Sequence, residues 1–304
     1  MVCEPESSES AGGSGFFKGY LLILLAATFW ATSGTLMKYL VQRYDLPPLL
    51  LAFCRDFITF FCVLVVLIFR KPSLVRIEPR DFPFFALMGA TSIGLHHAVL
   101  VHAFVLLDVA VATVLNYTAP AFVVLFSWLL LREPLTKVKI TALGLTFAGC
   151  VLVAEAYNPA HLKLDLVGLL LGLGAGATYG GYSLFSKYAV QRYSFWTVLL
   201  YAFGFGALTI LLYRPDVALA LAGAGGEVWL GVAALGLVST LGGYAFYTAG
   251  LKFLPVGPAS IVVTIELLIA ACLAFVVLGE MIDFLQIIGG ALIVSGVVLV
   301  SSRT

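Results

Sequence analysis

The residues best suited to chemistry in this sequence are ionisable side chains inside long apolar stretches. Glu266 lies midway along the apolar segment 256–278, and no cation is adjacent to it in the sequence. A carboxyl group surrounded by hydrocarbon needs a proton or a partner from another segment. We therefore expect Glu266 to border a functional site and to be able to bind a proton there.

Three histidines, His96, His97 and His102, lie in the apolar segment 82–106. Imidazole gains and loses a proton near neutral pH, so it suits proton transfer or substrate binding. Consecutive helical residues point about 100° apart, so at most one of His96 and His97 faces a cavity squarely. We take His97 as the second candidate, after Glu266, for a coupling proton.

The remaining charges inside apolar segments have structural interpretations. Arg55 and Asp56 are adjacent and opposite in charge, which favours a self-compensating pair within the segment 48–69. Lys38 and Lys187 lie near the ends of apolar segments, where long side chains reach the polar interface. We interpret both lysines as anchors, and the alternative is that these cations turn inward toward a cavity.

Hydroxyl, amide and aromatic side chains recur at helical spacing inside the apolar segments. A polar side chain that faces lipid is costly, so such stripes predict a central polar and aromatic cavity. The alternative is that Ser and Thr only hydrogen-bond to neighbouring helices. The candidate cavity residues are Trp30, Thr32, His97, Asn116, Tyr117, Tyr179, Ser183, Tyr244, Tyr247, Thr264 and Glu266.

Ten apolar segments carry these side chains. The chain is 62% hydrophobic and 11% charged, whereas soluble domains carry about 25% charged residues. A helix needs about 20 apolar residues to cross a bilayer, and it satisfies its own backbone hydrogen bonds there. We predict an all-α integral membrane protein with ten transmembrane helices near residues 17–40, 48–69, 82–106, 109–131, 138–156, 166–189, 195–213, 228–250, 256–278 and 284–301.

The sequence also repeats itself. The heptad Lys38–Tyr44 reads KYLVQRY, and Lys187–Tyr193 reads KYAVQRY. Further matches follow in order at a nearly constant offset, among them Glu133 with Glu280. Since an odd number of helices separates the two copies, they lie on opposite sides of the membrane. The pattern predicts two inverted five-helix repeats (5+5), an arrangement found in many secondary transporters.

The repeats divide the chain into three parts. We expect residues 1–16 to be a disordered cytoplasmic tail, residues 17–157 to form the first five-helix repeat and residues 158–304 the second. Most Lys and Arg residues between the apolar segments fall on the side of the N-terminus. By the positive-inside rule, we expect a multi-pass protein of the cell (inner) membrane with both termini in the cytoplasm.

Composition and spacing argue against several other functions. The formal net charge of +1 gives no sign of a nucleic-acid partner. The five cysteines show no C-x-x-C spacing, so we expect no metal site and no cofactor. No group of side chains suggests a catalytic site. The expected partners are a small-molecule substrate and the lipid bilayer, and the oligomeric state is left open.

A set of loosely spaced residues occurs in order in each half. They are Trp30, Lys38, Pro47, Pro48, Arg55, Pro120, Leu131–Leu135, Gly144 and Gly149 in the first half, and Tyr179, Lys187, Glu266, Leu278–Glu280, Gly290 and Gly296 in the second. In these residues the chain resembles the drug/metabolite transporter superfamily, in particular its ten-helix members with two EamA-type domains. The resemblance covers nearly everything from about residue 17 onward. It departs from the family pattern at Glu266-Leu267, where the family often has Glu-Pro.

The resemblance implies a central substrate cavity and a transporter rather than an enzyme. The leading hypothesis is a secondary transporter that exports amino acids or related small metabolites by alternating access. A carrier for other small organic solutes or drugs is the alternative. A membrane enzyme acting on a lipid-linked substrate would need catalytic groups near one bilayer surface, and a channel would need rings of like charge. Neither pattern is present in the sequence.

Overall fold

The computed structural model describes residues 9–158, 165–218, 224–279 and 281–303, and the regular structure of these residues is helical throughout. The α-helices are α1 (Glu9–Tyr44), α2 (Pro48–Arg70), α3 (Phe82–Gly89), α4 (His96–Leu106), α5 (Val109–Asn116), α6 (Ala119–Leu131), α7 (Lys137–Val153), α8 (Leu166–Ala189), α9 (Phe195–Tyr213), α10 (Gly226–Ala234), α11 (Gly243–Gly250), α12 (Val256–Val262), α13 (Ile265–Leu278) and α14 (Phe284–Ser301). Short 3₁₀ turns lie at Pro72–Val75, Pro79–Asp81 and Pro215–Ala218.

These helices form the ten predicted membrane spans, so the prediction of an all-helical membrane protein is confirmed. Four spans consist of two consecutive helices, namely α3 with α4, α5 with α6, α10 with α11, and α12 with α13. Eight spans are long and apolar enough to cross a membrane by length and composition. The other two are α7, which has 17 residues, and the glycine-rich α8. Helix α1 begins at Glu9, inside the expected tail, and residues 1–8 of that tail lie outside the described residues.

The two halves share the same irregularities. The third and eighth spans each contain a π-helical segment, at Ala90–Leu95 and Leu235–Gly242. The fourth and ninth spans are each broken near the middle, at Tyr117–Thr118 and at Val263–Thr264. A π-helical segment is uncommon in an α-helix. Since both halves have one in the third span of the repeat and a break in the fourth, the internal repeat extends to the backbone.

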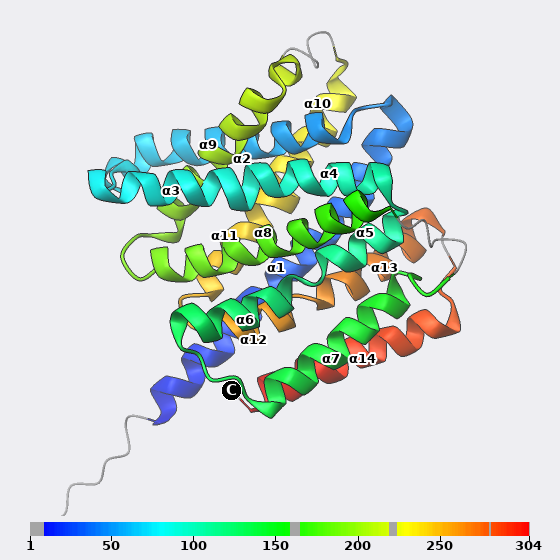
Figure 1. The fold of residues 1–304 in the computed structure, drawn as a ribbon. Coiled ribbons are helices and arrows are strands. Elements are labelled where there is room, and N and C mark those ends of the chain that lie inside the picture. Colours follow the sequence, from blue (N-terminus) through cyan, green and yellow to red (C-terminus); the bar gives the residue numbers. More distant parts are fainter. Residues whose placement is uncertain (1–8, 159–164, 219–223, 280, 304) are drawn as a thin grey trace, which may run out of the picture.

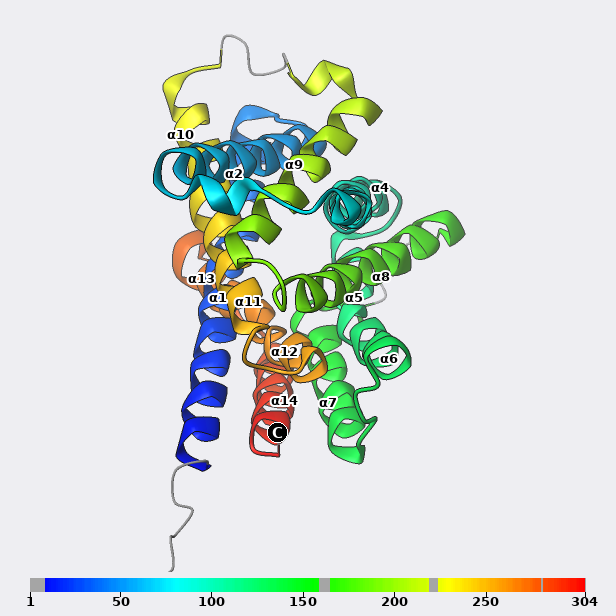
Figure 2. The same cartoon turned by 90° about the vertical axis from the view of Figure 1, so that its left-hand side faces the viewer.

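The last helices of the two halves lie side by side. Figures 1 and 2 show α7 along α14, with the start of α1 and the end of α14 at the same end of the molecule. Glycines allow this close approach, because a Cβ added to Gly149 would lie 2.6 Å from the carbonyl oxygen of Gly289. A Cβ on Gly289 would in turn lie 2.8 Å from the carbonyl oxygen of Gly149. Small residues of this kind are typical of tightly packed membrane helices.

A carboxylate ties the two halves together beyond the end of α6. Glu133 accepts hydrogen bonds from the backbone N–H of Val256, at 2.8 Å, and from the Lys139 ammonium group, at 3.1 Å. Val256 is the first residue of α12, so Glu133 satisfies a backbone donor that has no partner within its own helix. A residue of the first half therefore holds the start of a helix of the second half.

Lys187 anchors the end of α8 to the end of α11. Its ammonium group donates hydrogen bonds to the carbonyl oxygens of Leu251 and Leu254, each at 2.7 Å. Both carbonyls lie at or just beyond the C-terminal end of α11, where a cation is favoured by the helix dipole. Lys187 therefore holds two helices together. Lys38 is exposed, near the end of α1.

Candidate functional site

A cavity of about 140 Å³ lies between the two halves of the protein. Seven of the ten spans contribute side chains to it, and both broken spans border it. Six of the predicted cavity residues line it, namely Trp30, Asn116, Tyr117, Tyr179, Tyr244 and Glu266. Five further residues complete the lining, namely Ser33, Arg55, His96, Leu100 and Thr240.

Aromatic rings form one wall of this cavity. The Trp30 ring meets Tyr244 edge-on with centroids 4.8 Å apart, and Tyr179 edge-on at 6.1 Å. His96 stacks on Tyr179 at 5.3 Å and donates a hydrogen bond from Nδ1 to the carbonyl oxygen of Ala175. Edge-to-face contacts of this kind hold rings in fixed orientations. The wall is therefore rigid and presents π faces and polar edges to a ligand.

The breaks in the fourth and ninth spans position polar groups near the middle of these spans. Asn116 is the last residue of α5, and Tyr117 follows it in the non-helical turn. Glu266 lies in the first turn of α13, directly after the break at Val263–Thr264. Because each break turns the chain, it aims a polar side chain at the cavity from each half. Half-helix ends at the midplane are a common way to build a substrate site in transporters.

Two buried side chains, His97 and Asp56, hold the guanidinium group of Arg55, the only Lys or Arg among the described residues of the cavity lining. His97 donates a hydrogen bond from Nδ1 to Asp56, at 2.9 Å, and its Nε2 contacts the Arg55 guanidinium group. The Arg55 Nε also lies 3.7 Å from Asp56. With its proton on Nδ1, a neutral His97 accepts from Arg55 and donates to Asp56, so it bridges a buried ion pair. The expected Arg55–Asp56 pair is present, but it also directs the guanidinium group into the cavity.

Glu266 is the acidic counterpart of Arg55 in this lining. No ion pair within 4.0 Å joins it to a cation among the described residues. Three further polar atoms of the lining are buried and have no hydrogen-bond partner in the described part of the chain, namely Trp30 Nε1, Arg55 Nε and Asn116 Oδ1. Buried polar groups nearly always have a partner. The site therefore offers donors and acceptors that the protein itself does not satisfy.

Five predicted cavity residues lie outside this lining. His97 lies behind it in the chain just described, and Thr32 is hydrogen bonded to Ser239 at 2.7 Å. Ser183 and Tyr247 are hydrogen bonded to each other at 2.7 Å. With Thr264, these two border a small space of about 10 Å³ that also contacts Tyr117 and Tyr179.

Some of the residues that the prediction missed leave a signal in the sequence. Ser33 lies one helical turn after Trp30 and so shares its face. Arg55 is an intramembrane charge, which by itself is a reason to expect function. No group of three or more metal-ligating side chains occurs among the described residues.

Comparisons with known proteins agree with this architecture. Residues 17–154 and residues 166–302 each match the EamA-like transporter family. A solved crystal structure that is 22% identical superposes with a TM-score of 0.75, over 94% of this chain and 96% of the other. That likeness shows the same fold.

Three relatives are similar over nearly their whole length. An uncharacterized transporter of Archaeoglobus fulgidus is 26% identical, over 93% of this chain and 98% of the relative. An uncharacterized transporter of Clostridium kluyveri is 25% identical, over 93% of this chain and 92% of the relative. A protein of Streptantibioticus cattleyicolor named "Probable terminal-alkyne amino-acid exporter" is 25% identical, over 94% of each chain.

Proposed function

The chain belongs to the EamA-like transporter family and is a multi-pass membrane transporter, not an enzyme, and on that premise we propose that it exports small amphoteric metabolites, amino acids foremost. The proposed route is the central cavity, and the proposed mechanism is alternating access in which the two repeats rock about the bound substrate. Substrates of this class carry an ammonium group and a carboxylate close together.

One observation carries the proposal. The same small cavity contains a guanidinium group from the first half, Arg55, and a carboxyl group from the second half, Glu266. Arg55 suits a substrate carboxylate because its planar fork can donate two parallel hydrogen bonds. Glu266 suits an ammonium group. A zwitterion that binds between them satisfies both charges and contacts both repeats at once, as alternating access requires.

The rest of the lining supports a compact substrate of this kind. A volume of about 140 Å³ is small beside the roughly 300–1,000 Å³ of sites for drug-sized ligands. Trp30 and Asn116 supply buried polar atoms for additional hydrogen bonds, and the aromatic rings supply an apolar wall. The name of the Streptantibioticus cattleyicolor relative, an amino-acid exporter, is consistent with this substrate class.

The contacts of Glu133 and Lys187 support a gating role for the end of the molecule where these two residues lie. Glu133 joins the two halves there, and Lys187 holds the ends of α8 and α11. We infer that these bonds break when the cavity opens toward that side. The charge distribution supports a cytoplasmic location for this end and for both termini, in the cell (inner) membrane. We also propose residues 17–157 as the first repeat and 158–304 as the second.

A second substrate class has an observation of its own. Asp56 compensates the Arg55 charge, directly at 3.7 Å and through His97, whereas Glu266 has no such partner among the described residues. An ionised Glu266 would then make the cavity favour small organic cations, including drugs. Glu266 could also bind the coupling proton by exchanging it for the substrate ammonium group.

Flux measurements in proteoliposomes test the proposal. Purified protein is reconstituted, and the uptake of radiolabelled amino acids, organic cations and dicarboxylates is measured with and without a proton gradient. We expect saturable flux of at least one amino acid and none of the dicarboxylates. Saturable flux of cations alone would replace the leading proposal by the second, and the absence of substrate-dependent flux across the panel would refute both.

A further inference from the structure

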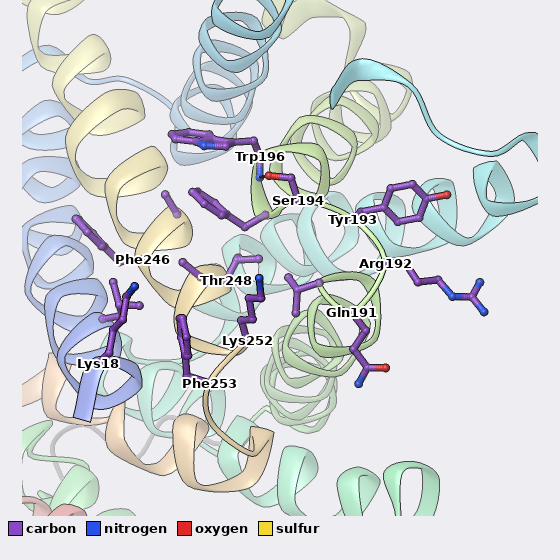
Figure 3. Close-up of a pocket in the computed structure, with 15 residues that line it drawn as sticks. Lys18, Gln191, Arg192, Tyr193, Ser194, Trp196, Phe246, Thr248, Lys252 and Phe253 are labelled. Atoms are coloured by element: carbon purple, nitrogen blue, oxygen red, sulfur yellow. Dashed lines mark hydrogen bonds between the residues drawn. The ribbon is translucent and has the colours of Figure 1, made fainter. Parts of the chain in front are cut away.

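A second cavity, much larger than the central one, lies between α1, α11 and the start of α9 (Figure 3). Its volume is about 840 Å³. We call it the α1–α11 groove, and the side chains that matter here are Lys18, Arg192, Trp196, Phe246, Lys252 and Phe253. It shares no lining residue with the central cavity.

The charges around this groove are all positive. Lys18, Arg192 and Lys252 line it, and none of the described residues in the lining is acidic. Figure 3 shows Lys18 on α1 and Lys252 just after α11, on either side of Phe253, whereas Arg192 extends away from the groove. Within the described part of the chain, neither lysine forms an ion pair with a carboxylate. Two ammonium groups that line one groove, without a carboxylate partner among the described residues, attract an anion.

The walls of the groove are apolar and aromatic. Phe246 and Phe253 flank the lysines, and the Lys18 ammonium group lies 5.0 Å above the centre of the Phe253 ring. Trp196 borders the groove at the start of α9. Aromatic rings beside lysines at the ends of membrane helices mark the level of the lipid headgroups. A ligand with an anionic head and an apolar body matches these walls, whereas a small hydrophilic anion leaves most of them uncovered.

A layer of hydrogen-bonded side chains separates the groove from the transport route. Thr248, on the groove wall, is hydrogen bonded to Tyr182 at 2.7 Å. Tyr182 is fully buried, and its ring packs edge-on against Tyr244 with centroids 4.8 Å apart. Tyr244 lines the central cavity from the other side. These side chains therefore close the groove toward the central cavity.

We propose that the α1–α11 groove binds an anionic phospholipid. Lys18 and Lys252 hold the phosphate of its headgroup, and an acyl chain lies against Phe246. Basic pockets between transmembrane helices are known to hold anionic headgroups. Because α1 belongs to the first repeat and α11 to the second, the bound lipid bridges the two halves beside the end that Glu133 and Lys187 close.

Lipid-dependent thermal stability tests the site. Wild-type protein in neutral detergent is titrated with phosphatidylglycerol or phosphatidylcholine, and the unfolding midpoint is followed by intrinsic fluorescence. We expect phosphatidylglycerol to raise the midpoint and phosphatidylcholine to leave it nearly unchanged. Since each lysine near an anionic lipid surface is worth about a fivefold change in affinity, the double variant Lys18→Gln/Lys252→Gln should need at least tenfold more phosphatidylglycerol.

Three comparisons make the outcome decisive. The matched control Lys71→Gln/Lys137→Gln removes the same charge from two exposed lysines outside the groove and should respond like wild type. The charge-keeping variant Lys18→Arg/Lys252→Arg should also respond like wild type. Equal responses of wild type and the Gln double variant would overturn the proposal. It would also be overturned if glycerol phosphate or a transported amino acid stabilised the protein through the same two lysines.

Discussion

Replacing His97 by Phe tests whether the buried chain Asp56–His97–Arg55 holds the cavity together. The ring volume is largely kept, but both contacts of the imidazole are lost. One is the 2.9 Å hydrogen bond to Asp56, and the other is the contact with the Arg55 guanidinium group. A hydrogen bond to a charged group contributes about 1.5–3 kcal/mol, so the two contacts together contribute about 3–6 kcal/mol.

The environment of Asp56 makes the loss large. Its side chain is 0% exposed, and one of its oxygens already has no hydrogen-bond partner among the described residues. Removing two hydrogen bonds to charged groups, at about 1.5–3 kcal/mol each, costs a large part of the 5–15 kcal/mol that separates folded from unfolded protein. We therefore expect the free energy of unfolding to fall by at least about 3 kcal/mol.

The assay pairs thermal unfolding with transport kinetics. His102→Phe is the matched control, because His102 lies on the same helix α4 but is exposed, and its hydrogen bonds to the Ala98 carbonyl oxygen and the Tyr213 hydroxyl involve no charged group. We expect His97→Phe to lower the unfolding midpoint far more than His102→Phe does. We also expect its KM to rise at least tenfold, since Arg55 is no longer fixed. The reasoning is refuted if the two variants match in stability and in KM.

Three other substitutions test separate parts of the structure. Glu133→Gln removes the charge that holds the start of α12. Backbone amides there should exchange hydrogen about five- to thirtyfold faster, as expected for a loss of about 1–2 kcal/mol. If the exchange rates are unchanged, this contact is not part of the proposed gate. Glu266→Gln should lower proton-driven flux at least tenfold while the protein still unfolds at the wild-type midpoint, and full pH-driven transport would exclude a proton role. Gly149→Ala places a Cβ 2.6 Å from the Gly289 carbonyl oxygen and should cost about 1–3 kcal/mol of stability. The control Gly144→Ala, with open space around it, should cost little. Equal unfolding midpoints for these two variants would contradict the packing of α7 on α14.

The membrane spans could be predicted from sequence because their signal is long and additive. Each span needs about 20 apolar residues, and few alternatives satisfy the backbone in lipid. The cavity residues Trp30, Asn116, Tyr179 and Tyr244 could be found for a related reason. Polar and aromatic side chains in the middle of a span have few favourable places other than a protein interior.

The choice between His96 and His97 could not be made from sequence. A π-helical segment at Ala90–Leu95 directly precedes them, and its extra residue per turn rotates every later side chain about the helix axis. A face extrapolated with 3.6 residues per turn is therefore wrong beyond that point. The structure has His96 in the cavity lining and His97 behind it, bonded to Asp56.

The contacts between side chains of distant helices also could not be predicted from the sequence. Adjacent Arg55 and Asp56 form the expected pair directly, with the Arg55 Nε 3.7 Å from Asp56. The sequence does not show the second link between them, which comes from His97 on another helix. Ser183 and Tyr247 similarly satisfy each other across 64 positions of sequence, so neither polar group is free to line the main cavity.

The central claim is that Arg55 binds the substrate carboxylate in the cavity. The most direct test measures the affinity of wild-type protein and of Arg55→Gln for a transported amino acid and for the matching amine without the carboxylate. We predict that Arg55→Gln weakens binding of the amino acid at least tenfold, because a charge-assisted bidentate contact is lost, and leaves the affinity for the amine unchanged. Equal losses for both ligands, or no loss for either, would contradict the account.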